Sequence, residues 1–295
     1  WYAEGLNIKY MDSADVIWII APWQWSYIPH QILEQKPVVC TIHHIVPDKF
    51  NHVKQREFLY RDKFVDAYHV PCRRTRDLLK KELFPEQLKN KTVWTQPFWV
   101  NGDLWKPISK KPSLREKHNL PQHKTLIGSF QRDTEGHDLI SPKLEKGPDL
   151  FCDAVEAFQK NRGNVEVVLA GWRRQYVMNR LDAAGIPYHY TELPSFETVN
   201  ELYNCLDMYI VSSRHEGGPQ AIFECALTKT PIISTRVGAA EYILHDDSLY
   251  FPGEELKAIP DVNHAFERVQ EYNMPSGMDP FIWFLQGVKI DKHSR

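Results

Sequence analysis

Short apolar segments alternate with amphipathic segments along the second half of the chain. Apolar runs occur at residues 125–130, 165–170 and 208–212, and the stretches between them carry apolar residues at helical spacing. Runs this short and this rich in Val and Ile suit strands buried on both faces, as found when helices cover a parallel sheet. The alternation therefore predicts an α/β fold in which the polar residues that follow the strands meet at one edge of the sheet.

The first third of the chain has the same alternation, and a candidate linker separates the two parts. Apolar runs at residues 16–21, 38–43 and 67–70 precede this linker. Residues 106–122 contain three prolines and charges of both signs, which is typical of a linker. A chain of 295 residues is long enough for two domains of ordinary size, and we predict one on each side.

Charge and cysteine content argue against several classes of protein. The formal net charge of -2 gives no global reason to expect a nucleic-acid partner. The five cysteines are scattered and never spaced as CxxC, which argues against a disulfide framework or a zinc site and for a reducing compartment. No apolar run approaches the ~20 residues that span a bilayer. The composition favours a cytoplasmic protein. Basic residues between 73 and 81 indicate either a solvated helix face or a peripheral contact with the inner face of a membrane.

The most informative segment, residues 212–224, joins a strand end to a helix start. Its residues of interest are Glu216, Gly217, Gly218, Pro219, Gln220 and Glu224. The glycines let a ligand approach the backbone, the proline suits a first helical turn, and free N–H groups there favour an anion such as a diphosphate. Glu224 would lie about 7 Å along the helix, so the two glutamates could hold two parts of one elongated ligand. The alternative is that Glu216 caps a helix and Glu224 lies on a solvated face.

Two basic residues are predicted to lie at the same edge of the sheet. Arg132 follows the strand at residues 125–130, and Lys146 precedes the helix that begins near Gly147. Both should therefore point over the edge that carries Glu216. An Arg and a Lys converging there could neutralise a leaving diphosphate without a metal. The alternative is that they are two surface cations on a loop.

Together these segments resemble the retaining glycosyltransferases of family 4, which have the GT-B fold. The resemblance covers residues 125–243. It is carried by Gly128 through Arg132, by Lys146-Gly147, by the Glu-Gly-Gly-Pro stretch between the two glutamates, and by residues 231–235 with Gly238. It implies that Arg132 and Lys146 bind the donor diphosphate. It also implies that Glu216 contacts the transferred sugar, aided by the backbone from Gly217 to Gln220, and that Glu224 binds the ribose hydroxyls. The long loop at residues 133–145 departs from the family pattern.

The first third carries a weaker part of the resemblance. Thr41-Ile42-His43-His44 ends a strand and looks like the Thr-Ile-His-Asp element of the family. This implies that His43 contacts the donor sugar or the acceptor near the reaction centre, whereas a histidine satisfied locally at a strand end is the alternative. The opening strand and Gly-rich loop of the family are not found before Val16. We therefore expect an N-terminal domain that is reduced or lacks its start.

The resemblance implies two Rossmann-like domains that face an interdomain cleft. Residues 1–112 would form the acceptor-side domain and residues 113–260 the donor-binding domain, with residues 261–295 as helices returning toward the first domain. The implied activity is retaining, metal-independent transfer of a sugar from a UDP-, GDP- or ADP-linked donor to a saccharide or lipid-linked acceptor. No cofactor is implied, because the nucleotide sugar is itself a substrate.

Three motifs that the sequence lacks argue against other classes of enzyme. GxGxxG, GxxxxGK[ST] and Asp-x-Asp do not occur, which argues against dinucleotide dehydrogenases, P-loop hydrolases and the metal-dependent glycosyltransferase fold. A sugar-nucleotide 2-epimerase of the same fold and a non-catalytic sugar-nucleotide-binding module remain as alternatives. The aromatic run at residues 22–27 could stack an acceptor sugar or fill the core.

Overall fold

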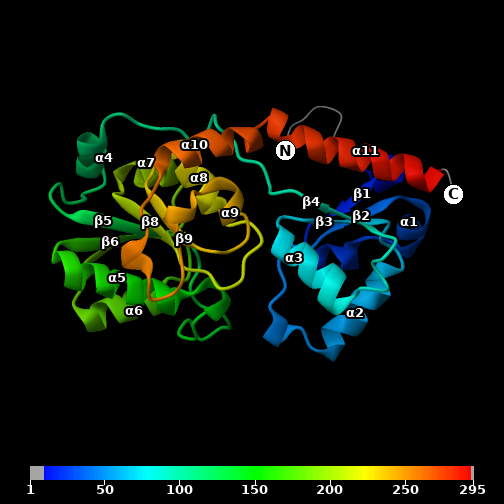
Figure 1. Cartoon of the computed structure of the whole chain (residues 1–295), viewed down its shortest axis with the longest axis horizontal. Coiled ribbons are helices and arrows are strands. Elements are labelled where there is room, and N and C mark those ends of the chain that lie inside the picture. Colours follow the sequence, from blue (N-terminus) through cyan, green and yellow to red (C-terminus); the bar gives the residue numbers. More distant parts are fainter. Residues whose placement is uncertain (1–9, 294–295) are drawn as a thin grey trace. The chain divides into compact units, whose positions relative to one another are not determined.

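The computed structural model describes residues 10–293, which form two compact α/β units (Figure 1). Unit 1 comprises Trp1–Pro97 together with Met278–Arg295, and unit 2 comprises Phe98–Gly277. Unit 2 is thus longer at both ends than the domain that the sequence predicts at residues 113–260. The C-terminal segment is divided between the two units.

Unit 1 is built on a four-stranded parallel sheet with the order β1-β2-β3-β4. Its strands are β1 (Ile17–Ile19), β2 (Val38–Thr41), β3 (Ala67–Val70) and β4 (Thr92–Thr95). Its helices are α1 (His30–Gln35), α2 (His52–Asp62), α3 (Arg73–Asp77) and α11 (Asp279–His293). A π-helical turn, Leu78–Leu83, continues α3. The predicted strands are present, because their Val, Ile and Tyr side chains supply much of the core of this unit.

A chain of hydrogen bonds fixes the strand ends of unit 1. The Trp18 indole donates to Thr41 Oγ1 at 2.8 Å, and Thr41 Oγ1 lies 3.1 Å from Nδ1 of the buried His69. His69 Nε2 donates to the carbonyl of Gln96 at 2.8 Å, so Nδ1 accepts from Thr41. Burial lowers the pKa of His69 to about 4, which keeps the ring neutral. Phe281 of α11 packs on Trp18 and His69, with ring centroids 4.5 and 4.9 Å away, and this contact ties α11 to the sheet.

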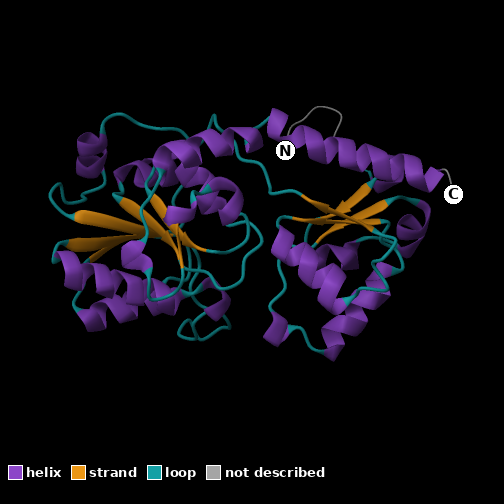
Figure 2. Cartoon of the chain, in the orientation of Figure 1, coloured by secondary structure: helices purple, strands orange, loops and turns teal. Residues whose placement is uncertain are grey.

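Unit 2 is built on a six-stranded parallel sheet with the order β10-β9-β8-β5-β6-β7. Its strands are β5 (Thr125–Ser129), β6 (Val165–Ala170), β7 (Tyr188–Thr191), β8 (Met208–Val211), β9 (Ile232–Thr235) and β10 (Leu249–Tyr250). Its helices are α4 (Lys111–Lys117), α5 (Pro148–Arg162), α6 (Gln175–Ala184), α7 (Phe196–Cys205), α8 (Gln220–Thr228), α9 (Ala240–Ile243) and α10 (Val262–Val269). Helices flank this sheet on both faces (Figure 2), which explains why β8 and β9 are buried along their whole length and β6 at every residue but Glu166.

The strand order of unit 2 has its switch point at β5. The chain passes from β5 outward through β6 to β7, then returns to the other side of β5 with β8 and continues outward. β5 and β8 are neighbours, but the connection after β5 leads to β6 on one side and the connection after β8 leads to β9 on the other side. In sheets of this kind such a point leaves a crevice at the carboxyl ends of the strands, where ligands bind. The loops that follow β5 and β8 carry the two predicted basic residues and Glu216.

The predicted linker is wrong in part, since residues 111–117 of it form α4, which packs on α7. The Lys111 ammonium pairs with Asp207 at 2.7 Å. The Arg115 guanidinium, which is 6% exposed, donates to the carbonyl of Cys205 at 2.8 Å and to the Asp207 carboxylate at 2.7 Å. Pro112 lies in the first turn of α4, a position where proline favours a helix, so its presence is a start signal and not a break.

Within residues 10–293, no helix combines the length and the apolar character that a membrane span requires. Over the same residues, no three His, Cys, Asp or Glu side chains gather as a metal site would require. All five cysteines are buried and unbridged.

Candidate active site

The loop after β8 is shaped by its contacts with β9 and the loop that follows it. Thr235 Oγ1, at the end of β9, donates to the carbonyl of Ser213 at 2.6 Å. Gly238 has φ +56°, and a Cβ added there would lie 2.6 Å from the Gly217 carbonyl oxygen and 2.8 Å from that of Glu216. Only glycine allows this approach, so Gly238 positions the backbone on which Glu216 stands.

A second tight contact fixes Lys146 to the end of β8. Gly147 has φ +63°, and an added Cβ would lie 1.9 Å from the Ser212 carbonyl oxygen. The buried Ser212 hydroxyl donates to the Gly147 carbonyl at 2.7 Å, and Gln131 Nε2 donates to the Lys146 carbonyl at 2.9 Å. The loops from β5 and β8 are thus joined through the Lys146-Gly147 backbone.

These contacts bring together two of the predicted site residues. The Lys146 ammonium forms an ion pair with the Glu216 carboxylate, and the two side chains are only 20% and 12% exposed. Neither side chain is therefore a freely solvated surface group. The capping alternative for Glu216 is wrong, because Pro219 is the residue that precedes α8 and the Glu216 carboxylate pairs with Lys146. A partly desolvated pair of this kind interacts more strongly than the same charges in water.

Arg132 lies in the same group of charges, together with a lysine that sequence reasoning missed. The Arg132 Nε donates to the Thr134 carbonyl at 2.7 Å, and its guanidinium carbon lies 5.9 Å from the ring centre of Trp172. Lys143 lies 3.8 Å from the Glu145 carboxylate and also interacts with Lys146, Arg132 and Glu216. Burial lowers its pKa first of all, Glu145 and Glu216 oppose this fall, and the two cations add to it. Only the short distance from Lys143 to Lys146 in the sequence could have indicated it.

The loop at residues 133–145 is an excursion that is closed at its base. Thr134 and Pro142 form an antiparallel bridge, and the Lys143 N–H donates to the Asp133 carbonyl at 2.8 Å. Below this base, the fully buried Arg174 guanidinium pairs with the Asp133 carboxylate at 3.3 Å. The loop therefore returns to the strand edge, where the Gln131 side chain, next to Arg132, donates to the Lys146 carbonyl at 2.9 Å.

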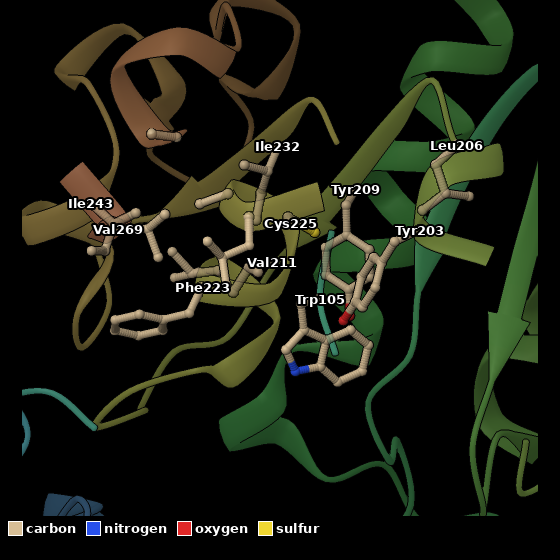
Figure 3. Close-up of a cluster of buried hydrophobic side chains, with 14 of the residues drawn as sticks. Trp105, Tyr203, Leu206, Tyr209, Val211, Phe223, Cys225, Ile232, Ile243 and Val269 are labelled. Carbon is tan, nitrogen blue, oxygen red and sulfur yellow. The ribbon is translucent and has the colours of Figure 1, made fainter. Parts of the chain in front are cut away.

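Glu224 is partly buried on α8 and its carboxylate is bound by a side chain from another helix, so the solvated-face alternative is wrong. Its Oε2 accepts a hydrogen bond from the Tyr203 hydroxyl at 2.7 Å. Burial raises the pKa of Glu224 to about 7, and the Tyr203 hydrogen bond opposes this rise. Tyr203 is a fully buried side chain whose ring contacts Trp105 and Tyr209 in one of the two cores of unit 2 (Figure 3). The tyrosine holds the carboxylate in one position, which sequence reasoning missed because Tyr203 comes from α7.

The remaining predicted residues lie around the start of α8 and in unit 1. Gly217 and Pro219 are buried, Gly218 is partly buried and Gln220 is exposed. The helix begins at Gln220, one residue later than the sequence indicates. The Ile222 N–H of its first turn donates to the Pro219 carbonyl at 3.0 Å, and the N–H groups of Gln220 and Ala221 precede the hydrogen-bond pattern of the helix.

His43 lies two residues beyond the end of β2 in unit 1. Its Nε2 lies 2.9 Å from the carbonyl of Ile20, to which it donates. The predicted strand at residues 38–43 therefore stops at Thr41, where the His43 side chain turns to the end of β1. His43 is fixed by its own domain, as the alternative for a strand-end histidine expects, and this contact leaves its role near the reaction centre as a prediction.

One family model and one curated relative match this chain. Residues 139–262 match the model described as Glycosyl transferases group 1, a segment that contains Lys146, Glu216 and Glu224 but neither Arg132 nor His43. The lipopolysaccharide core biosynthesis mannosyltransferase of Rhizobium meliloti (strain 1021) is 23% identical over 178 residues, which are 57% of this chain and 48% of the relative. The chain thus spans about half the length of the curated relative that it matches.

Solved structures resemble nearly the whole chain. Anabaena HepE in complex with UDP-glucose has a TM-score of 0.68 at 15% identity, covering 95% of this chain and 79% of that chain. An alpha,alpha-trehalose-phosphate synthase (UDP-forming) from Burkholderia vietnamiensis has a TM-score of 0.69 at 13% identity, covering 93% and 72%. At these identities the likeness concerns the fold. Together with the two parallel sheets, it gives the chain the GT-B fold with two Rossmann-like domains, and the fold class predicted from the sequence is confirmed.

Proposed function

We propose that the chain is a retaining, metal-independent glycosyltransferase. It would transfer a hexose from a UDP-, GDP- or ADP-linked donor to a saccharide or lipid-linked acceptor, without a cofactor. It would act in the cytoplasm or at the inner face of a membrane. The family match and the mannosyltransferase relative support sugar transfer, and the Anabaena structure with UDP-glucose supports a nucleotide-sugar donor.

One observation carries the proposal: the Lys146–Glu216 ion pair at the switch point of unit 2, beside the first turn of α8. Arg132, Lys143 and Lys146 supply positive charge at this edge, and the α8 start supplies backbone N–H groups. Such donors stabilise the charge that develops on a leaving diphosphate. The protein's own cations would therefore take the part that a metal ion plays in other transferases.

The two glutamates would act on different parts of the donor. Glu216 would lie beside the transferred sugar, where its carboxylate stabilises the positive charge that develops as the glycosidic bond breaks. The bond from the anomeric carbon to the phosphate oxygen breaks while the acceptor oxygen bonds to the same face of that carbon. The acceptor proton passes to the leaving phosphate, so the donor configuration is retained. Glu224 would accept hydrogen bonds from the ribose hydroxyls.

The test is an assay of the full chain with UDP-, GDP- and ADP-sugars, with and without saccharide acceptors. We expect one donor to release nucleoside diphosphate together with a glycosylated product, and EDTA to leave the rate unchanged. Proton NMR of the product should show the anomeric configuration of the donor. An inverted product, or activity abolished by EDTA and restored by Mn²⁺, would contradict the proposed mechanism. Free UDP or GDP without transfer to any acceptor would favour the epimerase, and donor binding without turnover the non-catalytic module.

A further inference from the structure

The 3₁₀ helix Pro22–Tyr27 of unit 1 exposes two aromatic rings that the donor site does not use. Trp23 is 66% exposed and Tyr27 is 70% exposed, and their ring centres lie 5.9 Å apart in an edge-to-face arrangement. The third aromatic residue, Trp25, is partly buried against the core, with the Arg61 guanidinium carbon 5.5 Å from its ring centre. Core packing thus explains Trp25, and it does not explain the other two rings.

This exposed pair stands on a fixed backbone. Gln24 Oε1 accepts hydrogen bonds from the N–H groups of Ile20 at 2.7 Å and Ala21 at 2.9 Å, which ties the short helix to the end of β1. The Ser26 hydroxyl donates to the Trp23 carbonyl at 2.9 Å. A ligand that stacks on a preformed surface loses less of its binding energy to ordering the protein. The rings are therefore presented as a platform and not as a loose loop.

The platform lies at the strand edge that also carries His43. It follows the carboxyl end of β1, the edge at which parallel sheets bind ligands. His43 Nε2 donates to the carbonyl of Ile20, and the two residues after Ile20 lead into the platform. The histidine predicted to lie near the reaction centre and the aromatic pair thus share one short piece of backbone.

The chemistry of the platform selects its occupant. Residues 22–27 contain no charged side chain, and they offer aromatic surface together with the hydroxyl groups of Ser26 and Tyr27. A pyranose presents an apolar face of C–H bonds and a rim of hydroxyls, which matches such a surface. An anionic lipid surface would instead be matched by a cluster of Lys or Arg. We propose that Trp23 and Tyr27 form a stacking subsite for a neutral pyranose unit of the acceptor saccharide. That this saccharide is an acceptor rests on the proposed transferase function.

Saccharide binding without any donor tests the subsite directly. Saturation-transfer NMR on the full chain with mannotriose and maltotriose should show contact with at least one sugar. Trp23→Ala should weaken the binding of that sugar about tenfold, as loss of a stacked ring commonly does. Trp283→Ala on α11 is the matched control, because Trp283 is also 66% exposed in unit 1, and it should change nothing. Tyr27→Phe should keep most of the binding that Tyr27→Ala loses, because it retains the ring and loses only the hydroxyl.

Turnover provides the second readout. Trp23→Ala should raise the acceptor KM about tenfold and leave donor hydrolysis without acceptor unchanged. Wild-type protein that contacts neither sugar, or equal losses in Trp23→Ala and Trp283→Ala, would overturn the subsite. Weaker co-sedimentation of Trp23→Ala with phosphatidylglycerol vesicles, at unchanged sugar binding, would assign the rings to a lipid surface instead. If the chain turned over no donor, the transferase proposal would fail while the NMR result still decided the subsite.

Discussion

Replacing Glu224 with Gln is expected to stabilise the folded chain above pH 7. Burial raises the pKa of this carboxyl from 4.5 to about 7 in the folded state. The folded chain therefore keeps a proton at pH values where the unfolded chain has released it, and stability falls as the pH rises through this window. At about 1.4 kcal/mol for each pH unit between 4.5 and about 7, an ionised Glu224 destabilises the fold by roughly 3 kcal/mol above pH 7.

A glutamine avoids this cost and keeps the local structure. Its amide oxygen has nearly the position of Glu224 Oε2 and accepts the same hydrogen bond from the Tyr203 hydroxyl. Urea unfolding followed by circular dichroism at pH 5 and pH 8.5 measures the effect. We expect a higher urea midpoint for Glu224→Gln at pH 8.5 and little change at pH 5, with the exposed Glu86→Gln neutral at both. A Glu224→Gln variant destabilised equally at the two pH values would refute the reasoning.

The same substitution should weaken donor binding, because the ionised Glu224 carboxylate is proposed to accept hydrogen bonds from the ribose hydroxyls of the donor. Wild-type affinity for the donor should then fall as the pH drops below about 7, where the carboxylate becomes protonated. Glu224→Gln should bind the donor weakly at every pH, with a flat profile between pH 5.5 and 8.5. Calorimetric titration at several pH values checks this. A Glu224→Gln variant that reproduces the wild-type profile would show that another group is responsible.

Three further predictions concern the Lys146 edge. Arg132→Ala and Lys146→Ala should each weaken UDP or GDP binding by about 1.5–3 kcal/mol in calorimetry, and unchanged affinity in both would remove the diphosphate assignment. Glu216→Gln should chiefly lower kcat in steady-state kinetics, and a change confined to the donor KM would contradict its position beside the transferred sugar. Gly147→Ala should lower Tm far more than Gly163→Ala, since both glycines have φ above +60° but only the first would place its Cβ 1.9 Å from a carbonyl oxygen. Equal losses of Tm would show that backbone strain alone decides.

The strands were the most predictable part of the fold. Val165–Ala170 and Ala67–Val70 occur at the predicted residues, because apolar runs in a parallel sheet are buried on both faces. The segment at residues 106–122 was not predictable in the same way. Its prolines indicate a linker, yet Lys111–Lys117 is helical and held to unit 2 through Asp207, a contact far away in the sequence. Local signals of this kind cannot show which residues a short helix will meet.

The site residues divide in the same way, into those that neighbouring sequence indicates and those that depend on contacts far away in the sequence. The backbone at Lys146 and Glu216 was indicated by two glycines of the sequence pattern, Gly147 and Gly238, because an added Cβ would meet the Ser212 carbonyl oxygen at the first and the Gly217 carbonyl oxygen at the second. Lys143 was not indicated in this way, since it lies in the loop at residues 133–145 and no glycine or strand end stands beside it. Its effect depends on a fold that returns the loop to the strand edge.

The return of that loop depends on a buried charge that no local motif marks. The Arg174 guanidinium, which is fully buried, donates to the Ser129 carbonyl at 2.5 Å and to the Ala170 carbonyl at 3.2 Å, so it joins the ends of β5 and β6. It also pairs with the Asp133 carboxylate at the base of the loop. Breaking such a pair leaves a buried charge without compensation, which costs several kcal/mol. The strand ends and the loop base are therefore held as one body. The loop between Thr134 and Pro142 can therefore vary in length without moving Arg132 and Lys143 on either side of its base.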